Sequence, residues 1–250
     1  MINCDRKSSI CAVPSCHKSI KNALLALLLL APVLSGTVSA QEVRYSWLDL
    51  SYKAQNFDRQ GSQVPVAGQT VDIDGSDGNG VRFRGSIGTW HGFYGFVDYG
   101  SVDIDAAAVI TNDQGVFFAE DEFDLTTIRG GLGFKYSIGF STDLIAEFSY
   151  DSIDFDFGSF AGENFDTSDQ DIGGALGIRS MLGDDFELRA WARYTNHETV
   201  DLDTGEFDTG SVYGAGFGWE FIRGLSIVGD YESGQFANWS IGFRLDLDED

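Results

Sequence analysis

Apolar and polar residues alternate with a period of two along most of this chain. In residues 238–247, Trp239, Ile241 and Phe243 are separated by serine and glycine. Because successive side chains of a strand point to opposite faces, this period predicts strands with one apolar face. A helical period is missing after the first 40 residues. The alternation occurs in ten segments: 43–53, 81–89, 93–101, 124–136, 143–152, 171–180, 187–195, 212–221, 225–231 and 238–247.

The connections between these segments are short and long in strict turn. The short ones are 90–92, 137–141, 182–185 and 222–224. The long ones, acidic and rich in glycine, asparagine and serine, are 54–80, 102–122, 153–170 and 196–210, and the last connection on that side, 232–237, is short. Segments of about ten residues with this arrangement of turns and loops are typical of a transmembrane β-barrel. The sequence therefore predicts an all-β, antiparallel, up-and-down barrel of ten strands. Eight strands are the alternative, because 225–231 is short and 196–210 is ambiguous.

Charged residues follow the second, non-apolar phase of the same strands. Nine bases and eight acids lie there, so the charge of this face is nearly balanced. A face open to water needs no such balance, whereas charges enclosed in a narrow barrel are costly unless they are paired. We therefore predict a salt-bridged lumen, with lipid covering the apolar phase. The predicted lumen residues are Asp49, Lys53, Arg82, Arg84, Asp98, Arg129, Lys135, Glu147, Asp151, Arg179, Glu187, Arg189, Arg193, Glu220, Asp230, Arg244 and Asp246. The glycines of this phase, which leave room for long arginine side chains, are Gly173, Gly177, Gly214, Gly216, Gly218 and Gly242.

A soluble β-sandwich or a lipocalin-like barrel is the alternative fold. In either of these, the apolar phase would form a packed interior and the arginine phase would face water. Aromatic residues gathered near strand ends favour the membrane barrel, since they form girdles at the two membrane interfaces. These residues are Tyr52, Trp90, Phe93, Tyr99, Tyr136, Tyr150, Tyr194, Trp219 and Trp239.

The first 40 residues predict a secretory signal. Four bases precede the apolar run 23–34, and Thr37-Val38-Ser39-Ala40 supplies small residues at the positions that a signal peptidase reads. A membrane-anchoring helix needs about 20 apolar residues, and this run is shorter and interrupted by Pro32. We predict cleavage after Ala40, which leaves a single barrel domain at 41–250. The three cysteines, Cys4, Cys11 and Cys16, all lie in the signal, so the mature chain has no thiol for a disulfide or a metal site.

Charge narrows the classes of function. Removing residues 1–40 takes away one acid and four bases, which leaves 38 acids, 12 bases and a net charge of −26. A chain this acidic is not expected to bind nucleic acid. Acidic chains are often disordered, but disordered chains lack aromatic residues, and 14% of this chain is aromatic.

Two features of the turns and loops are candidates for metal binding or catalysis, the acidic stretch 72–80 and the histidines His91 and His197. The acidic stretch 72–80 does not fit a calcium-binding EF-hand loop, because Asp77 stands where the pattern needs glycine and Phe83 where it needs glutamate. His91 lies in a short turn. His197 has neither an aspartate two residues before it nor a serine two residues after it. Since no nucleophile can be paired with a base, we predict no catalysis, no metal and no cofactor.

The end of the chain carries a family resemblance. Ser240, Gly242, Leu245 and Leu247 match the C-terminal assembly signal of outer-membrane proteins, with leucine in place of the usual final aromatic residue. Together with the ten strands, this ending resembles small bacterial outer-membrane β-barrels, such as the transmembrane domain of outer-membrane protein A and small adhesins. The resemblance covers the whole mature chain. It implies a monomer in the outer membrane, in contact with lipid and lipopolysaccharide, that the barrel-assembly machinery inserts.

The strand number bears on transport. An eight-stranded barrel is filled by its own side chains, whereas 16–18 strands leave a channel. Ten strands lie near the filled end, so we expect a largely closed lumen, long acidic external loops and a structural or surface-interaction role. A narrow, low-conductance pore is the first alternative. A surface adhesin or a barrel hydrolase is the second.

Overall fold

The computed structural model describes the backbone of residues 43–56, 62–66, 69–112, 115–160, 163–201, 206–234 and 237–247. Side chains are described in the same ranges, except for residues 62–76, 90, 105–123, 155, 157–167 and 196–209. The predicted signal, 1–40, lies outside the described residues. Within them, no helix has the length and apolar character needed to cross a membrane.

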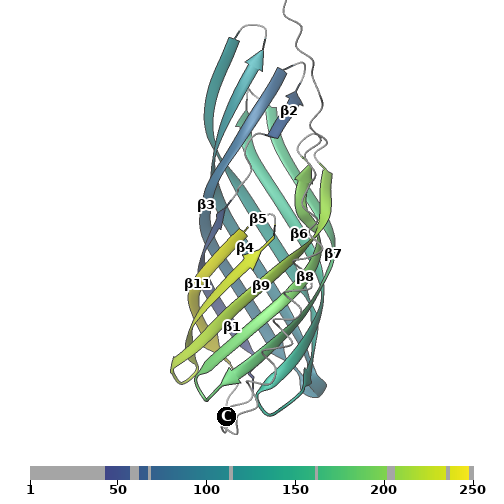
Figure 1. Ribbon diagram of the computed structural model, residues 1–250, viewed down its shortest axis with the longest axis vertical. Coiled ribbons are helices and arrows are strands. Elements are labelled where there is room, and N and C mark those ends of the chain that lie inside the picture. The colour runs from purple at the N-terminus through teal and green to yellow at the C-terminus, as the bar shows by residue number, and fades with distance from the viewer. Residues whose placement is uncertain are drawn as a thin grey trace, which may run out of the picture. The chain divides into compact units, whose positions relative to one another are not determined.

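Ten antiparallel strands close into a barrel (Figure 1). Each strand pairs with its neighbours in the sequence, and β1 closes the ring by pairing with both β11 and β3. The short strand β2 (Ser62–Val66) pairs with β3. This confirms the up-and-down barrel of ten strands and excludes eight. The barrel strands are β1 (Trp47–Asn56), β3 (Gln69–Gly88), β4 (Phe93–Asn112), β5 (Gly115–Ser137), β6 (Thr142–Phe160), β7 (Glu163–Leu182), β8 (Phe186–Asp201), β9 (Glu206–Ile222), β10 (Leu225–Ser233) and β11 (Ala237–Asp246).

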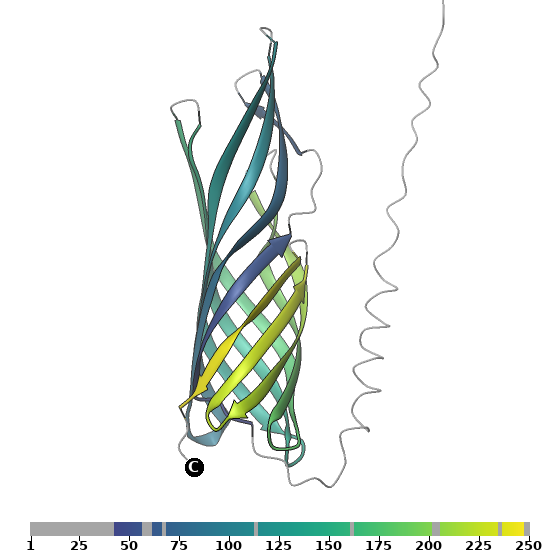
Figure 2. The same cartoon turned by 90° about the vertical axis from the view of Figure 1, so that its left-hand side faces the viewer.

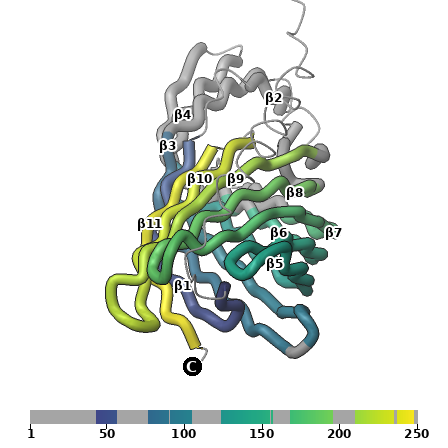
Figure 3. Tube along the Cα trace, turned by 60° about the horizontal axis from the view of Figure 1, so that its bottom comes forward, coloured from purple at the N-terminus to yellow at the C-terminus, as the bar shows by residue number. Residues whose placement is uncertain are grey.

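The four predicted short turns lie together at one end of the barrel, which Figure 3 brings forward. One of them is a 3-10 turn, η2 (Trp90–Gly92). His91 has φ +68° there and Gly92 has φ +82°, so the chain reverses through two successive left-handed residues. Gly183 and Gly224 take the same region in two other turns. The C-terminal end of β11 lies at this end as well (Figure 1).

The prediction of long loops at the other end was wrong. Most of 102–122, 153–170 and 196–210, together with 69–80, is strand, so that β3 to β9 have 16–23 residues. By contrast, β1, β10 and β11 have 10, 9 and 10 residues, the length that one membrane crossing requires. The longer strands continue past them as hairpins (Figure 2). The sequence did not reveal these extensions, because a strand whose two faces both meet water needs no alternation of apolar and polar residues.

The two faces of the barrel wall differ sharply in polarity. Large apolar side chains point outward with high exposed fractions, as in Leu132 and Leu176 (both 68%) and Ile87 (66%). The residues between them point inward and are buried, as in Asp49 (1%) and Arg244 (3%). A monomer in water does not cover its wall with apolar side chains. The alternative of a soluble fold with an apolar interior is therefore wrong.

Candidate functional site

The charged residues of the inward phase form the candidate site, inside the barrel. The structure buries ten of the predicted residues: Asp49, Lys53, Arg82, Arg84, Asp98, Asp151, Arg179, Glu187, Asp230 and Arg244. It leaves seven partly buried: Arg129, Lys135, Glu147, Arg189, Arg193, Glu220 and Asp246.

Glu187 is the centre of one cluster. This carboxylate accepts hydrogen bonds from Arg179 Nη2 (2.7 Å) and Arg244 Nη1 (3.2 Å), and Arg189 Nη1 lies 3.5 Å away. Arg189 also donates from Nε to Asp230 Oδ1 over 2.7 Å. Since the residues come from β7, β8, β10 and β11, the cluster ties four strands together. Charge-assisted hydrogen bonds of this kind offset the cost of removing charges from water.

Arg84 extends the cluster across the closure of the barrel. Its Nη2 lies 2.7 Å from Asp230 Oδ2 and 2.6 Å from Asp49 Oδ2. Ser51 Oγ donates a hydrogen bond of 2.5 Å to Asp49 Oδ1. The guanidinium of Arg84 thereby joins β3 to β1 and β10, the strands on either side of β11. Asp230 receives two arginines, one on each oxygen.

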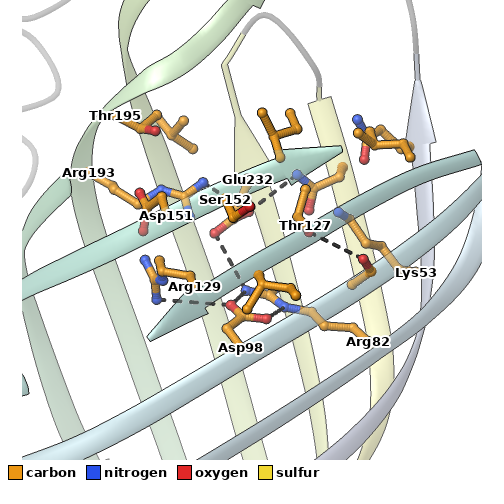
Figure 4. A pocket seen from close by; sticks show the side chains of 17 residues that line it. Lys53, Arg82, Asp98, Thr127, Arg129, Asp151, Ser152, Arg193, Thr195 and Glu232 are labelled. Carbon is orange, nitrogen blue, oxygen red and sulfur yellow. Dashed lines mark hydrogen bonds and ion pairs between the residues drawn. The ribbon is translucent and has the colours of Figure 1, made fainter. Parts of the chain in front are cut away.

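A second cluster lies farther from the short turns (Figure 4). Arg82 Nε donates to Asp98 Oδ1 over 2.9 Å. Arg129 Nη2 lies 3.6 Å from Glu147 Oε2 and 4.0 Å from Asp98 Oδ2. Glu232 lies 3.9 Å from both Arg82 and Arg193. Arg82 Nη2 also lies 2.5 Å from Asp98 Oδ2, so this pair is as close as those of the first cluster, and only the contacts around it are longer.

The residues that precede β1 close the lower end of the interior, which is the end nearest the short turns. We predicted a strand from residue 43, but β1 begins at Trp47. Tyr45 is 4% exposed and reaches across to the opposite wall, where its hydroxyl donates to Asp143 Oδ2 over 3.1 Å. Its ring packs on Tyr94 (4.9 Å between centroids), and Arg179 lies 4.6 Å from its centre. Burial raises the pKa of the Tyr45 phenol, so the hydroxyl remains a donor at neutral pH.

A third group of ion pairs lies beside the short turns. Arg44 Nη1 is 3.2 Å from Glu220 Oε2 and 3.1 Å from Asp246 Oδ2. Glu220 also accepts a hydrogen bond of 2.8 Å from the backbone of Gly224. The remaining predicted lysine, Lys135, lies 4.7 Å from the centre of the Tyr45 ring.

Gly216 shows why glycine occupies several inward positions. A Cβ atom built there would collide with Asp230 Oδ1 and would lie 2.7 Å from Arg189 Nε. A side chain at this position would therefore break the ion pair between Asp230 and Arg189. The sequence prediction that inward glycines leave room for arginine holds at this position.

Sequence reasoning missed several residues of the site. Glu232 was assigned to a loop, although it continues the buried, inward phase of Ser226, Val228 and Asp230. It accepts hydrogen bonds from Trp191 Nε1 and Asn238 Nδ2, both over 3.2 Å. Tyr94 was also missed, and its hydroxyl donates to Glu147 over 2.9 Å. Extending each alternation to its last matching residue would have found Glu232.

The predicted assembly signal lies on the strand that closes the barrel. Ser240 is 4% exposed and points inward, whereas Leu245 (50%) and Leu247 (45%) are exposed. Gly242 pairs with Ser51 of β1 and with Val228 of β10. Leu247 follows the end of β11, and its backbone donates to Ser46 over 2.8 Å.

The structure gives few contacts for the two histidines and the acidic stretch 72–80. His91 lies exposed in η2. The side chains of 72–76 and of His197 lie outside the described residues. Among the described side chains, no group of three or more histidines, cysteines and acids is arranged to hold a metal ion.

The fold is a closed barrel with a charged interior and an apolar outer wall, and the sequence of the chain matches a known family of such barrels. A family model described as "Outer membrane protein beta-barrel domain" matches residues 23–221. The chain belongs to this family. Membership places the protein in the bacterial outer membrane, so that lipid covers the outward apolar phase of this outer-membrane barrel.

Several solved structures of outer-membrane barrels are similar to this chain, although their sequence identity to it is low. The translocator domain of autotransporter NalP from Neisseria meningitidis is 17% identical, with a TM-score of 0.41 over 92% of this chain and 96% of that one. OprG from Pseudomonas aeruginosa is 8% identical, with a TM-score of 0.43 over 85% and 100%. Ail of Yersinia pestis is 11% identical, with a TM-score of 0.37 over 80% and 99%. The curated proteins gave no match.

Proposed function

We propose that this outer-membrane barrel has a largely closed lumen and acts at the cell surface, not as a channel or an enzyme. The observation that carries the proposal is the ion-pair network that joins Arg179, Glu187, Arg189, Asp230, Arg84 and Asp49. These side chains come from five strands around the ring, so they extend across the interior as well as along it. Paired charges held this tightly resist separation, because each would be left without a partner in a confined space.

Tyr45 supports closure at the lower end. It contacts Asp143 on β6, which lies nearly opposite β1 in the ring, and Tyr94 on β4, which is separated from β1 only by β3. Val43 is 3% exposed beside them, and Phe96, Ile145 and Met181 pack against this group. The segment 43–46 therefore adds an apolar layer beneath the ion pairs.

Recording from planar bilayers tests closure. We expect the wild-type protein to give no steady single-channel steps. A variant with Arg82 and Asp98 both replaced by serine removes side-chain volume at constant net charge, and should give small steps. Steady, uniform steps from the wild type would contradict a closed lumen and favour the narrow pore.

The extended hairpins support a surface role. Segment 102–122 contains six acids and no base, and β4 and β5 stay paired through it as far as Asn112 and Gly115. Acidic groups and the phosphates of lipopolysaccharide are both ligands for divalent cations. We infer that this hairpin binds neighbouring lipopolysaccharide through calcium or magnesium.

Shortening that hairpin tests the surface role. Residues 106–121 would be removed and Asp105 joined to Glu122 through Asn-Gly, a sequence that favours a two-residue hairpin turn. We expect the barrel to assemble, as shown by altered gel migration without boiling, but binding to lipopolysaccharide vesicles in calcium to fall at least several-fold. The control keeps the length and replaces Glu120, Asp121 and Glu122 by their amides. Equal binding by all three proteins would contradict the role.

Export and assembly complete the proposal. Cleavage after Ala40 would release the barrel domain 41–250, and the barrel-assembly machinery would recognise the ending around Gly242. We expect the protein to be a monomer, because closure of the described strands leaves no barrel edge to which a second copy could add a strand.

A further inference from the structure

A cavity of about 110 Å³ lies within the outer half of the lumen. Its lining comes from nine of the ten barrel strands, and the labelled side chains in Figure 4 surround it. A water molecule needs roughly 10–15 Å³ measured in this way, so the space exceeds that of one water several times. It lies between two layers of different chemistry.

The layer farther from the short turns is apolar. Leu125, Ile153 and Val212 line the cavity from β5, β6 and β9, with exposed fractions of 2%, 6% and 5%. On β5 and β6 they stand one inward position beyond Thr127 and Asp151. Most of the inward phase nearer the turns is polar or charged, so this change to aliphatic side chains provides an apolar wall.

The layer nearer the turns carries an excess of positive charge. Four cations line the cavity, Lys53, Arg82, Arg129 and Arg193, against three acids, Asp98, Asp151 and Glu232. Lys53 is 8% exposed, and among the described side chains it has no ion pair with a carboxylate. Its Nζ would lie 3.6 Å from a Cβ added at Gly100, which places the ammonium beside the cavity wall of β4. A buried charge without a close partner is costly unless something else balances it.

Other polar atoms of the lining also lack partners. Arg82 Nη1, Arg129 Nε and Arg193 Nε donate no hydrogen bond to the described protein atoms. Buried polar atoms are nearly always satisfied in folded proteins. Three such donors around one cavity therefore point to an occupant that accepts hydrogen bonds.

We propose that this cavity binds a small organic monocarboxylate with an apolar body. The carboxylate would accept from Lys53 and from the arginine donors, and its single negative charge would balance the single surplus positive charge of the lining. The apolar body would contact Leu125, Ile153 and Val212. The cavity, at about 110 Å³, is somewhat smaller than the roughly 150 Å³ that holds benzene, so a single ring is the upper limit for the apolar body and a short aliphatic chain fits more easily.

This site does not depend on whether the lumen conducts. A closed barrel would hold the carboxylate as a bound ligand, and a narrow pore would hold it on its path. The closed lumen and the ligand site can therefore be disproved independently, the first by bilayer recording and the second by ligand binding.

Calorimetry on the purified barrel in an uncharged maltoside detergent tests the site, with benzoate as the probe. We expect saturable binding of benzoate, with acetate and benzyl alcohol each at least about tenfold weaker. The first lacks the apolar body and the second lacks the charge. Equal binding of benzyl alcohol and benzoate would overturn carboxylate recognition, and so would the absence of benzoate binding. These comparisons use the wild-type protein and need no variant to fold.

Substitution of Lys53 locates the site. Lys53→Met is expected to weaken benzoate binding at least about tenfold, whereas Lys135→Met, which removes the same charge near Tyr45, should leave it within about twofold. Altered gel migration without boiling would show that each variant has assembled. Equal loss in both variants would mean that the net charge of the lumen, and not this cavity, attracts the anion.

Discussion

Replacing Asp230 with asparagine is expected to lower the free energy of unfolding by about 3 kcal/mol. The substitution keeps the shape of the side chain but removes the charge that holds Arg84 and Arg189, each 2.7 Å away. Both arginines keep a second carboxylate, Asp49 and Glu187 respectively, which limits the loss. Unfolding by urea in lipid vesicles, followed by tryptophan fluorescence, measures the effect.

A matched control removes a carboxylate charge that lies outside this cluster. Asp185 is exposed in the turn between β7 and β8, and Asp185→Asn is expected to change the same free energy by less than about 0.5 kcal/mol. If the two variants unfold alike, the ion pairs of Asp230 only offset their own desolvation. The closed lumen would then need another explanation.

Gly242→Val is expected to prevent assembly of the barrel. A Cβ atom at this position would fall on the backbone of Leu50 and Ser51 in β1. Backbone of a paired strand cannot move aside as a flexible side chain can, so β11 would separate from β1 where the barrel closes. We expect the variant to lose the altered gel migration of the unboiled protein and to accumulate outside the membrane fraction.

Gly95→Val serves as the control for this prediction. Gly95 also lies in a barrel strand, but a Cβ there would meet its nearest neighbour, Gly131 O, at 4.0 Å and would point outward on β4. Valine at a lipid-facing position is compatible with a membrane strand, so assembly should proceed. Normal assembly of Gly242→Val would show that this glycine is not needed for the contact between β11 and β1.

The alternation was sufficient to predict most of the fold. A strand that separates lipid from a polar interior needs one apolar and one polar face, and this requirement is visible in residues such as Leu48, Asp49 and Leu50. The short turns were predicted because glycine and polar residues interrupt the alternation there. The extensions of β3 to β9 were not predicted, because beyond the membrane neither face must be apolar.

The candidate site was predicted only as a set of inward charges. Which partners meet depends on strand tilt and on closure: Arg84 of β3 reaches Asp49 and Asp230 because β1, β11 and β10 follow it around the ring. Tyr45 was hidden for another reason. It continues the inward phase of β1, so the sequence could not show that the strand pairing begins only at Trp47.

The amino-acid sequence by itself determined which face of each strand meets lipid and which meets the lumen, because the period of two assigns every residue to one face. It favoured ten strands, since each membrane crossing leaves its own run of alternation, and the structure excluded eight. Only the tertiary structure decided which charges pair, that residues 43–46 fill the end of the lumen nearest the short turns, and that a cavity lies beyond them beside Lys53, which forms no ion pair with a described carboxylate. Those features arise from side chains that are far apart in the sequence and meet only when β1 closes the ring.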